Sequence, residues 1–299
     1  MFKGCGTALI TPFAADGSLD EPALRRLVRR QVDDGIHFLV PGGTTGESPT
    51  LTRDEHLRLV AVTIEESGGR VPVVAGCGGY NTADIVSLAA DLQALGPQGL
   101  LSVTPYYNKP TAEGLYRHYA ELAGATDLPI VVYNVPGRTC CNITPDVLGR
   151  LAGIPGIVGV KEASGSIGQM ADVCQIVPSG FAVLSGDDAV TLPLMALGGV
   201  GVISVASNEI PGPMATLCNY ALAGDFAQAR TLHRRYLPLM NANFCETSPG
   251  PVKVAMEMMG LLDEARFRLP LTRPSATSSA IVRSALESVG LFKSHVVLA

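Results

Sequence analysis

Short apolar segments recur along this chain, and their spacing constrains the fold more than any other feature of the sequence. Each segment is a nearly unbroken run of Val, Ile, Leu and Ala, which is typical of strands that are buried on both faces. Successive runs begin about 20 to 33 residues apart, which leaves room for one helix between each pair. The eight runs occupy residues 6–12, 38–43, 71–78, 99–106, 129–136, 156–164, 182–188 and 201–208.

Helix-start signals lie between these runs. Residues 20–22 read Asp-Glu-Pro ahead of a segment with an apolar face, and Thr52 and Glu55 have the spacing of a capping box. Successive strand and helix units predict a closed (β/α)8 barrel, a TIM barrel of the α/β class, over residues 1–210, with C-terminal helices packed on it over residues 211–299. The alternative is an open doubly wound sheet, but no nucleotide-binding G-x-G-x-x-G motif follows the first run.

Composition excludes several classes of protein. The chain has 299 residues, of which 47% are hydrophobic and 16% charged, so it is neither disordered nor fibrous. Its net charge is -5 and it has no basic run, so we expect no nucleic-acid partner. Seven cysteines without a C-x-x-C pair, and no export signal, indicate reduced thiols and a cytoplasmic location. Residues 189–208 have the length of a membrane span, but Pro193 and Gly198 divide them, and we expect a helix, a turn and a buried strand instead.

Polar residues are concentrated where the predicted strands end. In a closed parallel barrel the carboxyl ends of all strands face one common site. The ends read Gly-Gly-Thr-Thr-Gly-Glu at 42–47, Thr-Pro-Tyr-Tyr-Asn at 104–108, Tyr-Asn-Val-Pro-Gly-Arg at 133–138 and Lys-Glu at 161–162. The five histidines have no metal-ligand spacing and there is no G-x-S-x-G motif, so we predict neither a metal site nor a serine hydrolase.

Lys161 stands out because it ends an apolar run that holds no other polar residue. Strand alternation places its side chain on the same face as Ile157 and Gly159. If that face is the barrel interior, burial disfavours the ammonium form, and a neutral amine becomes available to attack a carbonyl and form a Schiff base. The alternative is a lysine paired with Glu162 or with another carboxylate in the barrel mouth.

Tyr133 and Arg138, which follow the apolar run of the preceding strand, fit such chemistry. Tyr133 shares a face with Val131, and its hydroxyl needs a partner that Thr44, expected on the second strand, can supply as part of a proton path. The alternative is that Tyr133 is a structural residue of the core. Arg138 lies in a Pro-Gly turn and can hold a substrate carboxylate with two hydrogen bonds, or it is a surface arginine.

Five motifs at these strand ends resemble the family of pyruvate-dependent class I lyases that contains dihydrodipicolinate synthase and N-acetylneuraminate lyase. The motifs are Gly-Thr-Thr-Gly-Glu at 43–47, Thr-Pro-Tyr-Tyr-Asn-Lys-Pro at 104–110, Tyr-Asn-Val-Pro-Gly-Arg-Thr at 133–139, Gly-Val-Lys-Glu-Ala-Ser-Gly at 159–165 and Ser-Gly-Asp-Asp at 185–188. They occur in the family's order, and the resemblance covers nearly the whole chain. Arg138 and Tyr107 favour the dihydrodipicolinate synthase branch, because sialic acid lyases and sugar-acid aldolases usually lack an arginine in this turn.

The resemblance implies a reaction and a role for each catalytic residue. Lys161 forms an imine with pyruvate, and Tyr133 moves protons through Thr44 to Tyr107, which reaches in from a neighbouring subunit. The reaction is the condensation of pyruvate with L-aspartate 4-semialdehyde to 4-hydroxy-2,3,4,5-tetrahydrodipicolinate, the first step of the diaminopimelate and lysine branch. No cofactor is needed because the lysine imine is the electron sink. The implied assembly is a homotetramer built from dimers.

The same resemblance implies four substrate-binding positions. Thr45 holds the pyruvate carboxylate and Arg138 the carboxylate of the semialdehyde. Backbone groups near Gly186 and Ile203 line the pocket beside the lysine.

Members of this family are often inhibited by lysine in a cleft between subunits. The corresponding positions here are Ser48, Pro49, Arg53, His56, Tyr80, Asp84 and Tyr106. Tyr80 stands where sensitive enzymes commonly carry asparagine, and Asp84 stands where they carry the longer glutamate. We therefore predict that inhibition by lysine is weak or absent.

Two alternative functions keep part of this site. A lyase or dehydratase of the same family that acts on another aldehyde or sugar acid keeps Lys161 and Tyr133 and changes the partner of Arg138. A non-catalytic paralogue keeps the barrel and binds a small carboxylate, but it has no chemical need for the complete set of residues.

Overall fold

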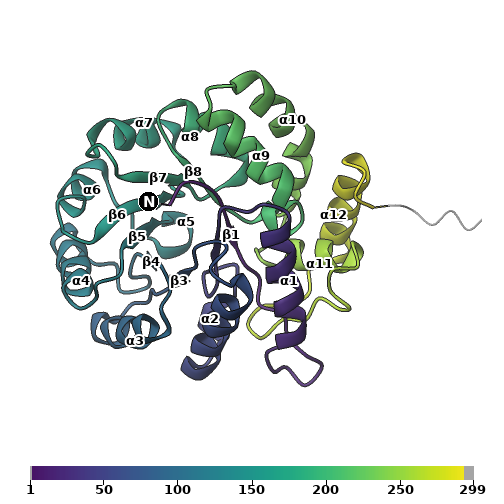
Figure 1. Cartoon of the computed structure of the whole chain (residues 1–299), viewed down its shortest axis with the longest axis horizontal. Helices are drawn as coiled ribbons and strands as arrows, with labels where there is room; N and C mark the ends of the chain where they lie inside the picture. Colours follow the sequence, from purple (N-terminus) through teal and green to yellow (C-terminus); the bar gives the residue numbers. More distant parts are fainter. Residues whose placement is uncertain (1, 293–299) are drawn as a thin grey trace, which may run out of the picture.

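The computed structural model describes residues 2–292, and Figure 1 shows parallel strands surrounded by helices. The predicted TIM barrel is confirmed. Its strands are β1 (Gly4–Ala8), β2 (Phe38–Val40), β3 (Val74–Gly76), β4 (Gly99–Val103), β5 (Ile130–Asn134), β6 (Ile157–Glu162), β7 (Ala182–Ser185) and β8 (Gly201–Ser204). Their order in the sheet is β2-β1-β8-β7-β6-β5-β4-β3, and a parallel bridge from Leu39 to Val73 joins the two ends.

The first strand begins and ends earlier than the apolar run at 6–12 predicts. It pairs with β2 from Gly6 to Phe38 and with β8 from Gly4 to Gly201. A side chain at Gly6 would place its Cβ 2.1 Å from the Phe38 ring, so only glycine fits this crossing. The apolar residues after Ala8 are buried in the loop, where the Ile10 amide donates to the Asn208 side chain at 3.2 Å.

Helices follow the strands as expected. They are α1 (Glu21–Asp33), α2 (Arg53–Ser67), α3 (Thr82–Leu95), α4 (Ala112–Gly124), α5 (Pro136–Thr139), α6 (Pro145–Leu151), α7 (Ile167–Ile176), α8 (Thr191–Ala196), α9 (Pro211–Leu222), α10 (Phe226–Ala242), α11 (Gly250–Met258) and α12 (Ala276–Ser288), with short 3-10 turns η1 (Ser48–Thr50), η2 (Asp188–Val190) and η3 (Ala206–Asn208). The capping box predicted at Thr52 and Glu55 is present at the start of α2.

The last four helices extend the barrel along one side (Figure 1). Helix α9 packs on β1 and on α10, and α12 packs on α10 and α11. Because α9 contacts both the barrel and the added helices, a division of the chain at residue 210 stays a prediction.

The barrel interior is filled by a separate apolar cluster. Its fully or nearly buried members are Phe2, Ala8, Phe38, Val40, Val74, Leu101, Val131, Tyr133, Val135, Leu184 and Ile203. Ile157 is not on this face, so the prediction that it shares a face with Lys161 is wrong: Ile157 packs among the outer helices, whereas Val158 contacts the interior. The register shifts by one residue here, because Ile130 pairs with Ile157 but Val131 pairs with Gly159, and this bulge reverses the alternation.

Residues 189–208 form helix α8 and strand β8, as predicted from Pro193 and Gly198. Over the described range, 2–292, no helix has the length and apolarity needed to cross a membrane.

A buried histidine on α4 predicts a pH dependence of stability. His118 is 4% exposed, its Nδ1 lies 2.9 Å from the Thr82 hydroxyl, and burial lowers its pKa to about 4 from the ordinary 6.5. The unfolded chain therefore binds this proton first, so stability is complete above pH 6.5 and falls as the pH drops towards 4. We expect His118 to account for about 2–3 kcal/mol of this loss.

Urea unfolding of the wild type and of His118→Gln between about pH 7 and about pH 4.5 measures this contribution. The variant should show a smaller decrease in the free energy of unfolding on acidification. Equal decreases in the two proteins would contradict the assignment.

Candidate active site

Lys161 lies near the carboxyl end of β6 and faces the barrel interior. It is 4% exposed, it pairs in register with Tyr133 on β5 and Leu184 on β7, and its Nζ lies 4.2 Å from the centre of the Tyr133 ring. Figure 1 shows these three strands side by side. The sequence prediction that Lys161 sits at a strand end on the inner face is correct, although the bulge at Ile157 removes part of its stated reason.

Lys161 is not paired with Glu162. The Glu162 carboxylate instead accepts hydrogen bonds from the Asn134 side chain at 3.0 Å and from the Ser164 amide at 2.8 Å. Among residues 2–292 Lys161 takes part in no ion pair. Its amine is therefore buried beside an aromatic face and has no carboxylate partner among these residues.

The loop after β2 carries both threonines of the predicted site. Thr44 lies four residues beyond the end of β2, so its expected position on the strand is wrong; the strand ends at Val40 because the chain turns at Gly42, where φ is +68°. Within residues 2–292 no hydrogen bond joins Thr44 to Tyr133. Thr45 is 5% exposed and lies in the same turn.

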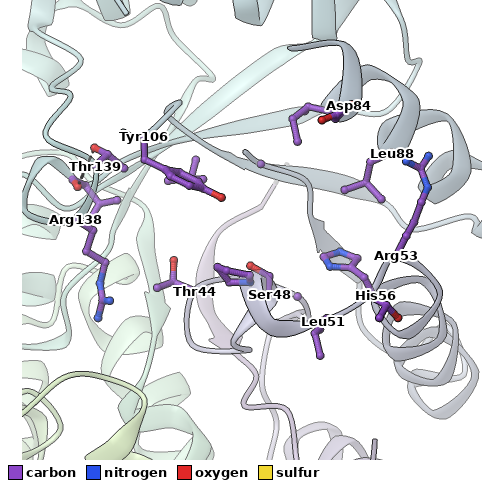
Figure 2. Close-up of a pocket in the computed structure, with 17 residues that line it drawn as sticks. Thr44, Ser48, Leu51, Arg53, His56, Asp84, Leu88, Tyr106, Arg138 and Thr139 are labelled. Atoms are coloured by element: carbon purple, nitrogen blue, oxygen red, sulfur yellow. Dashed lines mark hydrogen bonds between the residues drawn. The ribbon is translucent and has the colours of Figure 1, made fainter. Parts of the chain in front are cut away.

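A cavity of about 390 Å³ opens beside this loop (Figure 2). Thr44, Val135, Arg138 and Thr139 line one part of it. The remainder is lined mainly by Gly42, Ser48, Pro49, Leu51, Thr52, Arg53, His56, Gly78, Asp84, Ile85, Leu88, Val103 and Tyr106. The structure thus brings residues predicted for substrate binding and residues predicted for inhibitor binding to one continuous cavity. Lys161 and Tyr133 are not part of its lining.

Arg138 lies on the short helix α5 and reaches towards this cavity (Figure 2). Its Nη2 donates to the carbonyl of Ser248 at 3.2 Å, and among the described residues it has no carboxylate partner. The guanidinium therefore keeps donors free for an anionic group.

Of the predicted catalytic residues, Tyr107 is the most exposed. It is 91% exposed, it has φ +71°, and it follows Tyr106 in the loop between β4 and α4. Asn108 fixes this loop by donating to the carbonyl of Tyr80 at 2.9 Å. The side chain of Tyr107 projects away from its own barrel.

The two remaining predicted positions lie on the β7 and β8 side of the barrel, Gly186 directly after β7 and Ile203 on β8. A Cβ at Gly186 would lie 3.1 Å from Lys161 Cε and 2.6 Å from the Cβ of Ala163, so glycine leaves room for the lysine side chain. The Gly186 amide donates to the carbonyl of Glu162 at 2.8 Å. Ile203 on β8 is fully buried in the barrel interior.

Residues predicted for inhibitor binding do not all line the cavity. Ser48, His56, Asp84 and Tyr106 do, whereas Tyr80 is 57% exposed and packs edge-on against Tyr106, with 5.4 Å between ring centres. His56 donates from Nε2 to the carbonyl of Gly76 at 2.8 Å, and burial lowers the pKa of its imidazole.

Sequence reasoning gave no role to two buried ionisable residues close to this site, Asp188 and Lys253. Asp188 accepts hydrogen bonds from the amides of Val205 and Ala206 at 3.0 and 2.8 Å, and burial raises the pKa of its carboxyl. Lys253 on α11 contacts Glu47 with both side chains fully buried. The available signal for Lys253 was a lysine inside the apolar segment 251–256, the same signal that singled out Lys161.

Fold and site together define a class: an enzyme built on a (β/α)8 barrel, with a buried lysine at the end of the sixth strand and an arginine at the rim. Within residues 2–292 no group of three His, Cys, Asp or Glu side chains is arranged to hold a metal ion. The chain belongs to the dihydrodipicolinate synthetase family, whose family model matches residues 1–289, and it is a lyase of that family.

Similar proteins agree with this assignment. The chain is 51% identical over 296 residues to 4-hydroxy-tetrahydrodipicolinate synthase of Koribacter versatilis, covering 99% of this chain and 98% of the relative. Among solved structures, dihydrodipicolinate synthase from Aquifex aeolicus has a TM-score of 0.94 and 43% identity, covering 97% of this chain and 99% of that one. The corresponding enzyme from Thermotoga maritima has a TM-score of 0.95 and 44% identity, covering 98% and 100%.

Proposed function

We propose that this enzyme condenses pyruvate with L-aspartate 4-semialdehyde to give 4-hydroxy-2,3,4,5-tetrahydrodipicolinate, the first step of the diaminopimelate and lysine branch. The observation that carries the proposal is Lys161, which is buried on the inner face of the barrel beside Tyr133 and forms no ion pair with the described residues. Membership of the dihydrodipicolinate synthetase family and the names of its relatives support the choice of substrates.

Lys161 acts as the nucleophile. Its neutral amine attacks the ketone carbon of pyruvate, and loss of water gives an imine whose nitrogen accepts electrons when a methyl proton leaves. The enamine carbon then attacks the aldehyde of the second substrate. The amino group of that substrate finally attacks the imine carbon, closes the ring and releases Lys161. No external cofactor takes part in these steps.

The neighbouring residues bind substrates and move protons. Tyr133 lies against the amine and exchanges protons as the imine forms and breaks. Thr44, which has no hydrogen bond to Tyr133 among the described residues, is proposed as the next group in the path. Thr45 and backbone groups near Gly186 and Ile203 hold the pyruvate part. Arg138 binds the carboxylate of the semialdehyde.

The active site is completed by a second copy of the chain. Tyr107 is the exposed end of the proton path, and its 91% exposure supports a role in the site of a neighbouring subunit. We propose a homotetramer built from such dimers. Mixing inactive Lys161→Ala and Tyr107→Phe proteins should restore part of the activity if the sites are shared.

We place the enzyme in the cytoplasm. All seven cysteines lie within the described residues and are unpaired, as is usual for thiols in a reducing compartment.

The function is tested by measuring pyruvate-dependent condensation with aspartate semialdehyde, followed through coupled reduction of the product. Cleavage of N-acetylneuraminate, measured in parallel, is the control for the sugar-acid branch. Rapid condensation without cleavage supports the proposal. If neither reaction proceeds while borohydride still traps pyruvate on Lys161, the aldehyde is a different one.

We expect lysine to inhibit this enzyme weakly or not at all. Asp84 lines the cavity with a carboxylate that already accepts a hydrogen bond from the Asn81 side chain at 2.8 Å, and Tyr80 is packed against Tyr106. A short and occupied carboxylate binds an incoming ammonium poorly. Half-maximal inhibition by sub-millimolar lysine would overturn this expectation, and the double variant Tyr80→Asn with Asp84→Glu should gain sensitivity.

A further inference from the structure

A fully buried ion pair joins the loop after β2 to the helices beyond the barrel. Lys253 Nζ lies 2.6 Å from Glu47 Oε1, and both side chains are 0% exposed. The same ammonium donates to the carbonyl of Thr11 at 2.9 Å, in the loop that follows β1. One side chain on α11 therefore connects the loops after the first two strands.

Among the described residues, the Glu47 carboxylate has Lys253 as its single hydrogen-bond partner. Its other carboxylate oxygen, Oε2, is buried and has no hydrogen-bond partner among the described residues. The rings of Phe13 and Phe267 lie 4.6 and 4.9 Å from Lys253 Nζ and shield the pair from solvent. The cost of burying an unpaired carboxylate makes the position of Glu47 follow the position of Lys253.

Glu47 in turn closes the turn that carries Thr44 and Thr45. Its φ is +55°, in the left-handed region, and its amide donates to the carbonyl of Thr44 at 3.0 Å. The adjacent Gly46 carbonyl accepts from the Thr11 hydroxyl at 2.6 Å. Thr11 thus contacts the turn directly and contacts Lys253 through its own carbonyl.

We propose that Lys253 is a positioning residue for pyruvate binding, acting through Glu47 and Thr11 on the turn that presents Thr44 and Thr45. The proposal rests on the function proposed above, in which this turn holds the pyruvate carboxylate. It assigns the C-terminal helices a part in substrate binding, although none of the four predicted substrate-binding positions lies on them.

Lys253→Met keeps an unbranched side chain one atom shorter than lysine and removes both hydrogen bonds. The turn should lose its fixed geometry, so the pyruvate concentration for half-maximal imine trapping should rise by about tenfold or more, with a smaller change in trapping rate at saturation. Arg273→Met is the matched control. It removes the surface ion pair between Arg273 and Glu257, which lies on α11 like Lys253, and it should leave pyruvate binding unchanged.

The double variant Glu47→Gln with Lys253→Met separates positioning from stability. It removes the unpaired carboxylate, so its unfolding midpoint should recover, whereas half-saturation by pyruvate should stay high because the links to Thr11 and Glu47 remain absent. Recovery of both quantities, or unchanged pyruvate binding in Lys253→Met, would overturn the proposal. Glu47→Asp, which withdraws the carboxylate by one methylene, provides the same binding measurement if the other variants do not fold.

The readout distinguishes this inference from the proposed function. Borohydride trapping of pyruvate needs only the first substrate. If the wild type traps pyruvate but does not use aspartate semialdehyde, the function fails and the role of Lys253 is still measured. If the wild type condenses both substrates and Lys253→Met binds pyruvate normally, only the positioning role fails.

Discussion

Lys161→Ala should give no borohydride-stable adduct with pyruvate, and condensation should fall by at least about a thousandfold. The expected loss is this large because no other described residue offers a buried amine beside Tyr133, and without the imine the methyl group of pyruvate has no electron sink. Mass spectrometry of the trapped protein and of its peptides measures the adduct and its position.

Lys3→Ala is the matched control because Lys3 is an exposed lysine near the start of the same barrel. It should label as fully as the wild type. Strong labelling that persists in Lys161→Ala would place the nucleophile elsewhere.

Arg138→His should leave pyruvate trapping intact while the KM for the aldehyde substrate rises about ten- to a hundredfold. A charged hydrogen bond to a carboxylate contributes roughly 1.5–3 kcal/mol, and the imidazole is shorter and mostly neutral at pH 7. The structure supports a selective effect, because Arg138 lines the cavity beside Thr44 and contacts only the Ser248 carbonyl among hydrogen-bond acceptors of the described residues.

Steady-state kinetics with each substrate varied in turn separates the two half-reactions. Arg150→His, which alters an exposed arginine paired with Glu113, should leave both KM values unchanged. Equal damage to pyruvate trapping and to aldehyde binding in Arg138→His would show that Arg138 is structural.

The fold could be predicted because each strand is apolar on both faces. Such runs can be recognised in the sequence alone. The helix signals between them, such as the capping box at Thr52, depend only on residues a few positions apart. The ends of the strands are harder to predict. The run at 6–12 continues past Ala8 because the loop after β1 is buried as deeply as the strand, so hydrophobicity alone does not mark the end of pairing.

The inner face of β6 shows where periodicity fails. Counting by two from Lys161 places Ile157 inside, but the bulge opposite Ile130 inserts one residue and moves Ile157 to the outer layer. A bulge is a property of two paired strands, and no residue of β6 alone specifies it.

Two parts of the candidate site depend on contacts that sequence order hides. Glu47 and Lys253 are 206 residues apart, and only the folded chain brings their charges together. Tyr107 is a different case, because its exposed side chain can take part in catalysis only if a second copy of the chain is present. The strand-end positions of Lys161, Tyr133 and Arg138 suggested candidate roles beside structural alternatives, the resemblance favoured those roles, and the structure adds the positions of the three side chains.

The pairing of β1 with β8 means that the first strand of the growing polypeptide must wait for the last strand before both its edges are paired. After β2 has formed, one edge of β1 stays unpaired until Gly201 to Ser204 have been synthesised. The Asn208 side chain then links the end of the barrel to β1 by donating to the carbonyl of Ala8 at 2.8 Å. At the usual speed of translation this takes roughly 10 to 40 seconds, during which an unpaired strand edge is available for aggregation. Lys253 is synthesised later still, so a chain that ends between Asn208 and Lys253 would contain all eight strands but lack the buried partner of Glu47.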